Sequence, residues 1–256
     1  MAEVEFHHEG RVAHVRLNRP EHLNAVTPEM DRLLAEVWAQ INNDPDIWCA
    51  ILSAAGDKAF CIGADMSERQ DNPSRVAFGG GLTGIGGPLL TLKKPLIAAV
   101  QGFCVGGGFE LAMCADIIVA TEAAEFGLPE TKFGIIGECG VVHRAVRQLP
   151  YRIAMAMILT GKRIDATSAA QFGLINEVVA MSELHDAAVL WATKINAASP
   201  LANQAAKAAV LARLNDPLEL ALSTRFELIE RYAESQDRRE GELAAKEKRK
   251  PVWTGK

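Results

Sequence analysis

The chain has 256 residues, of which 49% are hydrophobic and 23% charged, so it is long enough to bury a sizeable core and is not disordered as a whole. A formal net charge of −5 argues against a nucleic-acid-binding surface, and the uncharged runs are too short and too broken by glycine or proline to span a membrane. The five cysteines include no C-x-x-C pair, which indicates reduced thiols. The six histidines lack metal-ligand spacing, which argues against a metal site. Because the first ten residues also lack the apolar segment of a signal peptide, we expect a cytoplasmic protein without a metal, nucleic-acid partner or membrane partner.

The first two thirds of the chain predict a core of strands and helices. Alternating residues indicate a β-hairpin, with strands at 4–8 and 11–17. Thr27 and Pro28 then suit the N-cap and first position of an amphipathic helix. Short apolar runs predict further strands, at residues 48–53, 96–100, 117–120 and 174–179.

The last third of the chain is predicted to be mostly helical. We expect helices in four places, at residues 183–197, 200–213, 217–234 and 236–248. Ser182, Ser199 and Asp216 stand where N-caps would begin three of them. The sequence thus predicts an α/β core in residues 1–195, followed by a helical region in residues 196–256. Residues 78–88 contain six glycines and no charge, which is typical of a surface loop or lid.

A single charge, Glu110, interrupts an apolar and glycine-rich run from Phe103 to Ala115. A lone carboxylate on a helix without a polar face is expected to be buried, where it is costly unless it is paired or functional. Gly106, Gly107 and Gly108 precede this helix, so its first N–H groups are free to hold an anion. Glycine triplets also occur in plain turns. From these residues alone, an anion-binding helix start and a plain turn are both open interpretations.

A second carboxylate, Glu130, directly follows Pro129 and is predicted to open a short helix or turn. The N–H of Gly107 and that of Ala64, at the exit of another strand, are candidates to converge on one carbonyl oxygen as an oxyanion hole. Two glutamates beside that oxygen would suit acid–base chemistry, because burial raises a carboxyl pKa. The alternative is that Glu130 only stabilises a helix start.

Motifs along nearly the whole chain resemble the crotonase, or enoyl-CoA hydratase/isomerase, family. Their order and spacing together are specific, although each alone is weak. In chain order they are Asn18-Arg19-Pro20 with Leu23-Asn24-Ala25, Phe60 to Met66, Lys94-Pro95 with Ala98 to Gly102, Gly106 to Ala112, Ala115 to Ile117, Phe126-Gly127 with Pro129-Glu130, Leu159 to Gly161, and Lys248-Arg249 with Pro251 to Trp253.

The resemblance implies a ClpP/crotonase fold, a spiral of ββα units whose C-terminal helices form a homotrimer or a hexamer of two trimers. It implies an acyl-CoA thioester substrate, with the thioester oxygen between the amides of Ala64 and Gly107, and no cofactor besides the coenzyme A of the substrate. Glu110 and Glu130 match the glutamates with which hydratases add water to the 2,3 double bond, Glu130 giving the proton to the α-carbon. The residues implied to contact substrate are Ala25, Ala64, Asp65, Met66, Ser67, Gly106, Gly107 and Glu138.

One departure concerns the segment Gly137 to Val141, where many hydratases have Pro-Gly-Ala-Gly-Gly. Glu138 places a third acid near the expected acyl pocket, as in the similar carnitinyl-CoA dehydratases, where it would attract a cationic acyl group. Dienoyl-CoA isomerases look similar as well, so isomerisation through Glu138 is an alternative to hydration. A helix-capping role for Glu138 and a non-catalytic oligomer that only binds acyl-CoA are further alternatives.

Overall fold

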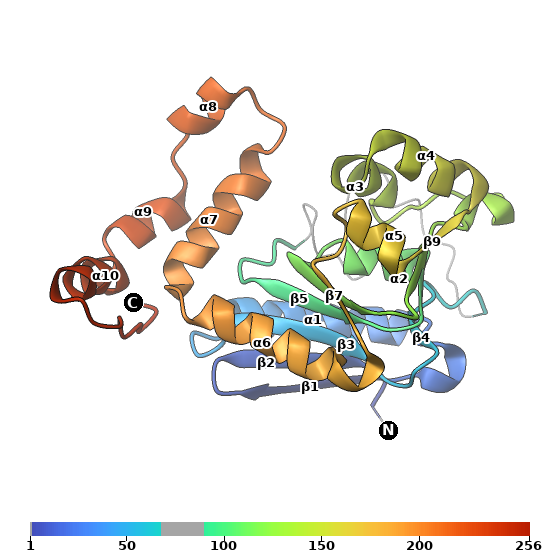
Figure 1. Ribbon diagram of the computed structural model, residues 1–256, viewed down its shortest axis with the longest axis horizontal. Helices are drawn as coiled ribbons and strands as arrows, with labels where there is room; N and C mark the ends of the chain where they lie inside the picture. The colour runs from blue at the N-terminus through green and yellow to red at the C-terminus, as the bar shows by residue number, and fades with distance from the viewer. Residues whose placement is uncertain (1, 68–89) are drawn as a thin grey trace.

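The computed structural model describes residues 2–67 and 90–256, and the expected loop at 78–88 lies outside these residues. The described strands form two sheets (Figure 1). The larger has the order β1-β2-β3-β5-β7-β10. Its strands are β1 (Val4–Glu9), β2 (Val12–Leu17), β3 (Cys49–Ala54), β5 (Leu96–Val100), β7 (Ile117–Thr121) and β10 (Glu177–Val179). The predicted hairpin is confirmed, because β1 and β2 are antiparallel and adjacent.

From β2 onward the strands of the larger sheet are parallel, which requires a crossover between each pair. Helices cover the sheet, so its inner strands need few polar positions, and every residue of β5 is buried. This is why β3, β5 and β7 occur in the sequence as short continuous apolar runs rather than as alternating patterns.

The smaller sheet has the order β4-β6-β8-β9 and consists of three-residue strands. They are β4 (Ala59–Cys61), β6 (Phe103–Val105), β8 (Glu125–Gly127) and β9 (Arg163–Asp165). A strand of the larger sheet is followed by one of the smaller sheet in three successive places, β3–β4, β5–β6 and β7–β8. After β6 comes α2 (Gly107–Ala112) and after β8 the 3-10 helix η3 (Glu130–Phe133). The expected spiral of ββα units is therefore confirmed.

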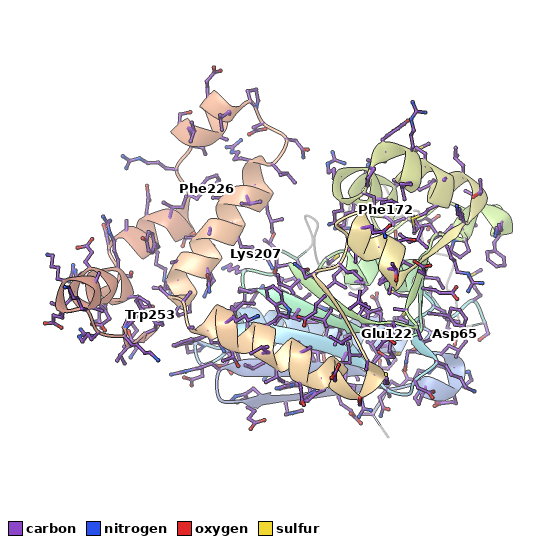
Figure 2. The ribbon with its side chains drawn as sticks, viewed as in Figure 1. Asp65, Glu122, Phe172, Lys207, Phe226 and Trp253 are labelled. Atoms are coloured by element: carbon purple, nitrogen blue, oxygen red, sulfur yellow. The ribbon has the colours of Figure 1, made fainter. Side chains whose placement is uncertain are left out.

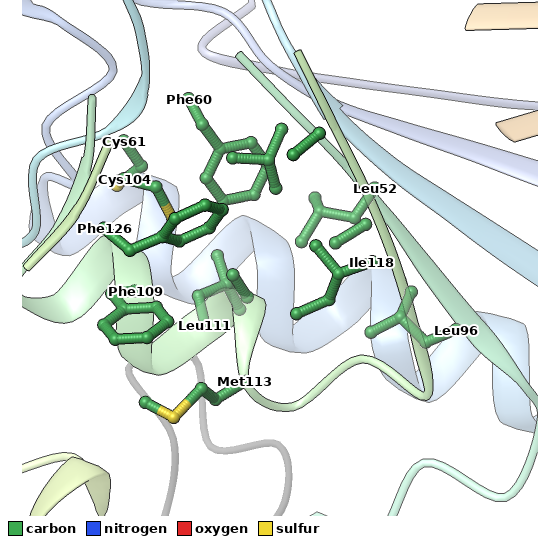
Figure 3. Close-up of a cluster of buried hydrophobic side chains, with 14 of the residues drawn as sticks. Leu52, Phe60, Cys61, Leu96, Cys104, Phe109, Leu111, Met113, Ile118 and Phe126 are labelled. Carbon is green, nitrogen blue, oxygen red and sulfur yellow. The ribbon is translucent and has the colours of Figure 1, made fainter. Parts of the chain in front are cut away.

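The main core lies between the two sheets and α2 (Figure 3). Phe109 of α2 and Phe126 of β8 are fully buried, with ring centroids 5.5 Å apart in a tilted arrangement that aromatic pairs favour. Leu111 points into the same cluster as Leu52 and Ile118 of the larger sheet. Because both faces of α2 are packed in this way, its only charged side chain, Glu110, is buried with it.

Helix α1 (Pro28–Asn43) begins as predicted, with the Thr27 hydroxyl accepting from the Met30 N–H at 3.0 Å. The helices from α3 onward are α3 (Val141–Gln148), α4 (Tyr151–Thr160), α5 (Ala166–Gln171), α6 (Leu184–Asn196), α7 (Pro200–Arg213), α8 (Leu218–Ser223), α9 (Glu227–Ala233) and α10 (Gln236–Glu247). They begin after β8, and two further 3-10 helices, η1 (Pro20–His22) and η4 (Met181–Glu183), are short connections.

Three helical predictions need correction. The helix expected at 217–234 is two helices, because Thr224 and Phe226 have extended backbone dihedrals that end α8 and begin α9. Asp216 is not an N-cap, since Pro217 occupies that position. Ser182 lies inside η4 and Glu183 precedes α6 instead. Ser199 does cap α7, accepting from the Ala202 N–H at 3.2 Å.

The C-terminal helices α7 to α10 extend to one side of the two sheets (Figure 1). Residues 250–256 return to the start of this region, where the Trp253 Nε1–H donates to the Ala197 carbonyl at 2.8 Å (Figure 2). The buried Asp237 carboxylate accepts from the Ser199 hydroxyl at 3.1 Å and from the Thr254 N–H at 2.8 Å. None of the described helices is long and apolar enough to cross a membrane.

Candidate active site

The exit of β4 and the start of α2 approach each other more closely than side chains would allow. A Cβ atom on Gly63 would lie 2.8 Å from the Gly107 nitrogen, and one on Gly108 would lie 2.2 Å from the Cys61 carbonyl oxygen. Gly63 also has φ +98°, which favours glycine. These glycines bring the backbone that carries Ala64 next to the first turn of α2.

Two backbone N–H groups remain available at this junction. Ala64 forms a parallel bridge with Val26, in which the Val26 N–H donates to the Gly63 carbonyl at 2.8 Å and the Asp65 N–H donates to the Val26 carbonyl at 2.9 Å. The N–H of Ala64 itself therefore points away from Val26, because neighbouring peptide groups of an extended chain alternate in direction. Among the described residues, no hydrogen bond uses the N–H of Ala64 or of Gly107, the first residue of α2.

Glu110 lies one helical turn into α2 and is only 2% exposed. Its Oε1 accepts from the N–H groups of Val141, at 2.9 Å, and Cys139, at 3.1 Å, at the start of α3. Burial raises the pKa of Glu110 to about 7, and the nearby Glu130 carboxylate adds to this rise, while the hydrogen bonds from Val141 and Cys139 oppose it. A carboxyl group with such a pKa can exchange a proton near neutral pH.

Glu130 opens η3 directly after Pro129, as predicted. Burial raises its pKa above the ordinary value. Its Oε1 is buried without a hydrogen-bond partner among the described residues, and it lies 3.5 Å from where a Cβ atom of Gly106 would stand. Since a buried unpaired oxygen is costly, this carboxyl group is placed for a partner that the folded chain does not supply.

One cavity of about 430 Å³ joins these groups. The predicted site residues that line it are Ala64, Asp65, Met66, Gly106, Gly107, Glu110, Glu130 and Glu138. Ala25 and Ser67 do not line it. The Ala25 carbonyl accepts from Arg19 at 2.7 Å, and Ser67 donates to Asp65 at 2.6 Å. Each directly adjoins a lining residue in the chain, Val26 and Met66 respectively.

Comparison with known proteins identifies the family. A family model described as enoyl-CoA hydratase/isomerase matches residues 7–256. The chain belongs to the enoyl-CoA hydratase/isomerase family.

Relatives from this family match the chain along nearly all of its length. It is 38% identical to an (E)-benzylidenesuccinyl-CoA hydratase of Thauera aromatica, covering 95% of this chain and 96% of that protein. It is 37% identical to a carnitinyl-CoA dehydratase of Proteus mirabilis, covering 96% of both. These relatives support an enzyme with hydratase or dehydratase activity.

Solved structures from the family match the fold. A crystal structure from Novosphingobium aromaticivorans, assigned as a short chain enoyl-CoA hydratase, superposes with a TM-score of 0.92 at 67% identity and covers 100% of this chain and 99% of that one. The enoyl-CoA hydratase of Mycobacterium tuberculosis has a TM-score of 0.90 at 35% identity, with 99% of both chains covered. The crotonase fold expected from the sequence motifs is thus confirmed.

Sequence reasoning missed part of the cavity wall of this family member. Val26, Thr27, Pro28 and Asp31 line it from the start of α1. Thr27 and Pro28 are visible in the sequence as a helix start, but only the bridge between Val26 and Ala64 shows that this start borders the site. No signal within residues 26–31 indicates such long-range pairing.

The composition of the wall limits what the site can hold. Five of its lining residues are acidic, Asp31, Asp65, Glu110, Glu130 and Glu138, and no Lys, Arg or His is found among the described residues that line it. Within the described residues no group of three or more His, Cys, Asp or Glu is arranged to hold a metal ion. Activity without a cofactor stays a prediction from the sequence.

Proposed function

We propose that Glu110 and Glu130 make this family member a reversible enoyl-CoA hydratase, adding water across the 2,3 double bond of an acyl-CoA thioester. The observation that carries this proposal is the presence of two carboxyl groups with raised pKa on the same cavity as two unused backbone N–H groups. Neither feature alone is specific, but together they supply an acid, a base and an oxyanion site.

In this mechanism the thioester oxygen accepts from the N–H groups of Ala64 and Gly107. Ionised Glu110 takes a proton from water, and the water oxygen bonds to C3 while the electrons of the double bond move to the thioester oxygen as an enolate. Protonated Glu130 then gives its proton to C2 as the carbonyl re-forms, so that one water is added in all, and exchange with solvent returns Glu110 to the ionised form and Glu130 to the protonated form. The raised pKa of Glu130 favours the protonated form that this step needs.

The acyl group is proposed to be neutral or cationic rather than anionic, because no Lys, Arg or His among the described lining residues could pair with a carboxylate on the acyl chain. Exposed apolar side chains on the same wall, Met66, Phe133 and Ile136, suit contact with the hydrocarbon part of a ligand. A crotonobetainyl group meets both conditions, whereas a free carboxylate on the acyl chain, as in benzylidenesuccinyl-CoA, would find no cationic partner on the described wall.

The test is incubation with crotonyl-CoA, longer 2-enoyl-CoAs, crotonobetainyl-CoA and benzylidenesuccinyl-CoA, followed by absorbance of the conjugated thioester and product mass. A gain of one water supports hydration, and the order of kcat/KM tests the charge argument. Glu130→Gln should lower kcat about 10²- to 10⁴-fold and leave KM nearly unchanged. Movement of a double bond without a change in mass would favour isomerisation through Glu138, and tight binding without reaction would favour a non-catalytic role.

The chain is further proposed to assemble as a homotrimer or a hexamer of two trimers through residues 196–256. Support comes from large apolar side chains that this region exposes, Leu214, Leu218 and Leu222, which are 60%, 72% and 77% exposed in the single chain. Surfaces of this kind usually mark an interface. A cytoplasmic location stays a prediction from the sequence.

A further inference from the structure

Arg19 has no role in the mechanism above, yet its side chain is only 9% exposed and sits behind the cavity wall. It precedes η1, and its guanidinium contacts three separate segments of the chain. The Nη1 group donates to the Ala25 carbonyl at 2.7 Å and to the Asp65 carboxylate at 3.1 Å, and Nε lies 3.1 Å from the Glu3 carboxylate.

These contacts converge on the bridge that orients the Ala64 N–H. One contacted residue, Ala25, precedes Val26 in the bridge, and another, Asp65, follows Ala64. The third, Glu3, also accepts from the Thr27 hydroxyl at 2.7 Å. The guanidinium therefore holds both sides of the bridge in place at once.

The carboxylate of Asp65 is fixed from two directions. It accepts from the N–H and hydroxyl of Ser67, at 3.0 and 2.6 Å, as well as from Arg19. The hydrogen bonds from Ser67, followed by that from Arg19, lower the pKa of Asp65 to about 2, so it stays ionised at neutral pH. Figure 2 shows Asp65 on the side of the molecule away from Trp253 and the C-terminal helices.

We propose that Arg19 is a positioning residue that sets the direction of the Ala64 N–H toward the thioester oxygen. The inference rests on the proposed function, because Ala64 is one of the two oxyanion donors in that proposal and Arg19 is inferred to position it. A lysine cannot replace it, because one ammonium group lacks the planar fork whose Nη1 and Nε reach Asp65 and Glu3 together. Arg19 itself is not among the residues that line the cavity.

The experiment compares wild type with Arg19→Lys and with Asp65→Asn, which breaks the same pair but leaves Arg19 in contact with Ala25 and Glu3. The control is Arg32→Gln, because Arg32 also pairs with two carboxylates, Glu29 and Glu36, but on the exposed surface of α1. The first readout is the shift to longer wavelength that cinnamoyl-CoA absorbance shows when hydrogen bonds polarise its thioester carbonyl. The second is the separation of kcat from KM for crotonyl-CoA.

Both Arg19→Lys and Asp65→Asn should lose at least half of the wavelength shift and lower kcat about 10- to 100-fold, part of the roughly 10²- to 10³-fold that removal of an oxyanion donor costs. KM should change less than about threefold, and Arg32→Gln should match wild type. If Arg19 only stabilised the fold, the two variants would instead unfold at a lower urea midpoint, and their folded fraction would keep the full wavelength shift. That result would overturn the proposal.

The wild-type result separates this inference from the proposed function. If wild type shows the shift but hydrates no ester, hydration is refuted, and the positioning role is decided by the shift alone. If wild type binds cinnamoyl-CoA without any shift, no oxyanion donor is engaged and the positioning role of Arg19 is overturned.

Discussion

The backbone of Gly63 lies so close to Gly107 that a Cβ atom on Gly63 would stand 2.8 Å from the Gly107 nitrogen. This proximity joins two elements that are more than 40 residues apart in the chain, the exit of β4 and the first turn of α2. The two N–H groups of the proposed oxyanion hole, those of Ala64 and Gly107, depend on it. The absence of a side chain at residue 63 is therefore required for the geometry of the site as well as for the fold.

Replacing Gly63 with alanine should push the start of α2 away and lower kcat about 10²-fold, because the Gly107 N–H would lose its alignment. Gly173→Ala is a matched control. Gly173 also has positive φ, at +75°, but a Cβ atom there would have no neighbour within 4 Å. Both variants share the backbone strain of about 1 kcal/mol, and only Gly63→Ala should lose activity with crotonyl-CoA. Equal activity losses in the two variants would mean that strain, rather than the contact with Gly107, explains the effect.

The stability of the protein should depend on the ionisation of Glu110. Its pKa is raised from 4.5 to about 7 by burial, so between these values the folded chain keeps a proton that the unfolded chain has lost. Stability from this group is complete below about pH 4.5 and is lost as pH rises through 7. Glu110→Gln cannot ionise but keeps one acceptor oxygen. Its stability relative to wild type should therefore increase as pH rises.

The gain in the free energy of unfolding between pH 5 and pH 8 should reach up to about 3 kcal/mol, since one pKa unit corresponds to about 1.4 kcal/mol. Urea unfolding at both pH values measures it. Glu21→Gln, at an exposed position, serves as the control and should match wild type at both pH values. A constant difference between Glu110→Gln and wild type at both pH values would show that folding does not raise the pKa of Glu110.

How much of this site could be foreseen differs from residue to residue. The burial of Glu110 follows from a lone charge in an apolar run, and the caps at Thr27 and Ser199 follow from local hydrogen-bond chemistry, so both were predictable. Strands β6, β8 and β9 have three residues each, too few to show a period. The place of Arg19 behind Ala64 depends on contacts across the fold, and no local pattern encodes such contacts.

The C-terminal tail should come loose when Asp237 is replaced with alanine. That carboxylate is 1% exposed and accepts from the Ser199 hydroxyl and from the N–H groups of Thr254 and Gly255. Removing it leaves these donors without a partner, and we expect a loss of about 3 kcal/mol in the free energy of unfolding. Faster tryptic cleavage after Arg249 should accompany the loss. The exposed Asp57→Ala is the control, and cleavage at the same rate in both variants would show that other contacts hold the tail.

Assembly through the C-terminal helices should fail when Leu222 is replaced with glutamate. Leu218 and Leu222 lie one turn apart on the same face of α8, and the single chain leaves both largely exposed. If copies of the chain bury this face, a charge there costs several kcal/mol at each contact.

Wild type should then have a solution mass of three or six times 27.6 kDa in light scattering, and Leu222→Glu should lower this mass toward that of a single chain. Ser223→Glu adds the same charge at the neighbouring exposed residue and should keep the wild-type mass. An unchanged mass in Leu222→Glu would exclude this face of α8 from the interface, and a single-chain mass for wild type would refute the proposed oligomer.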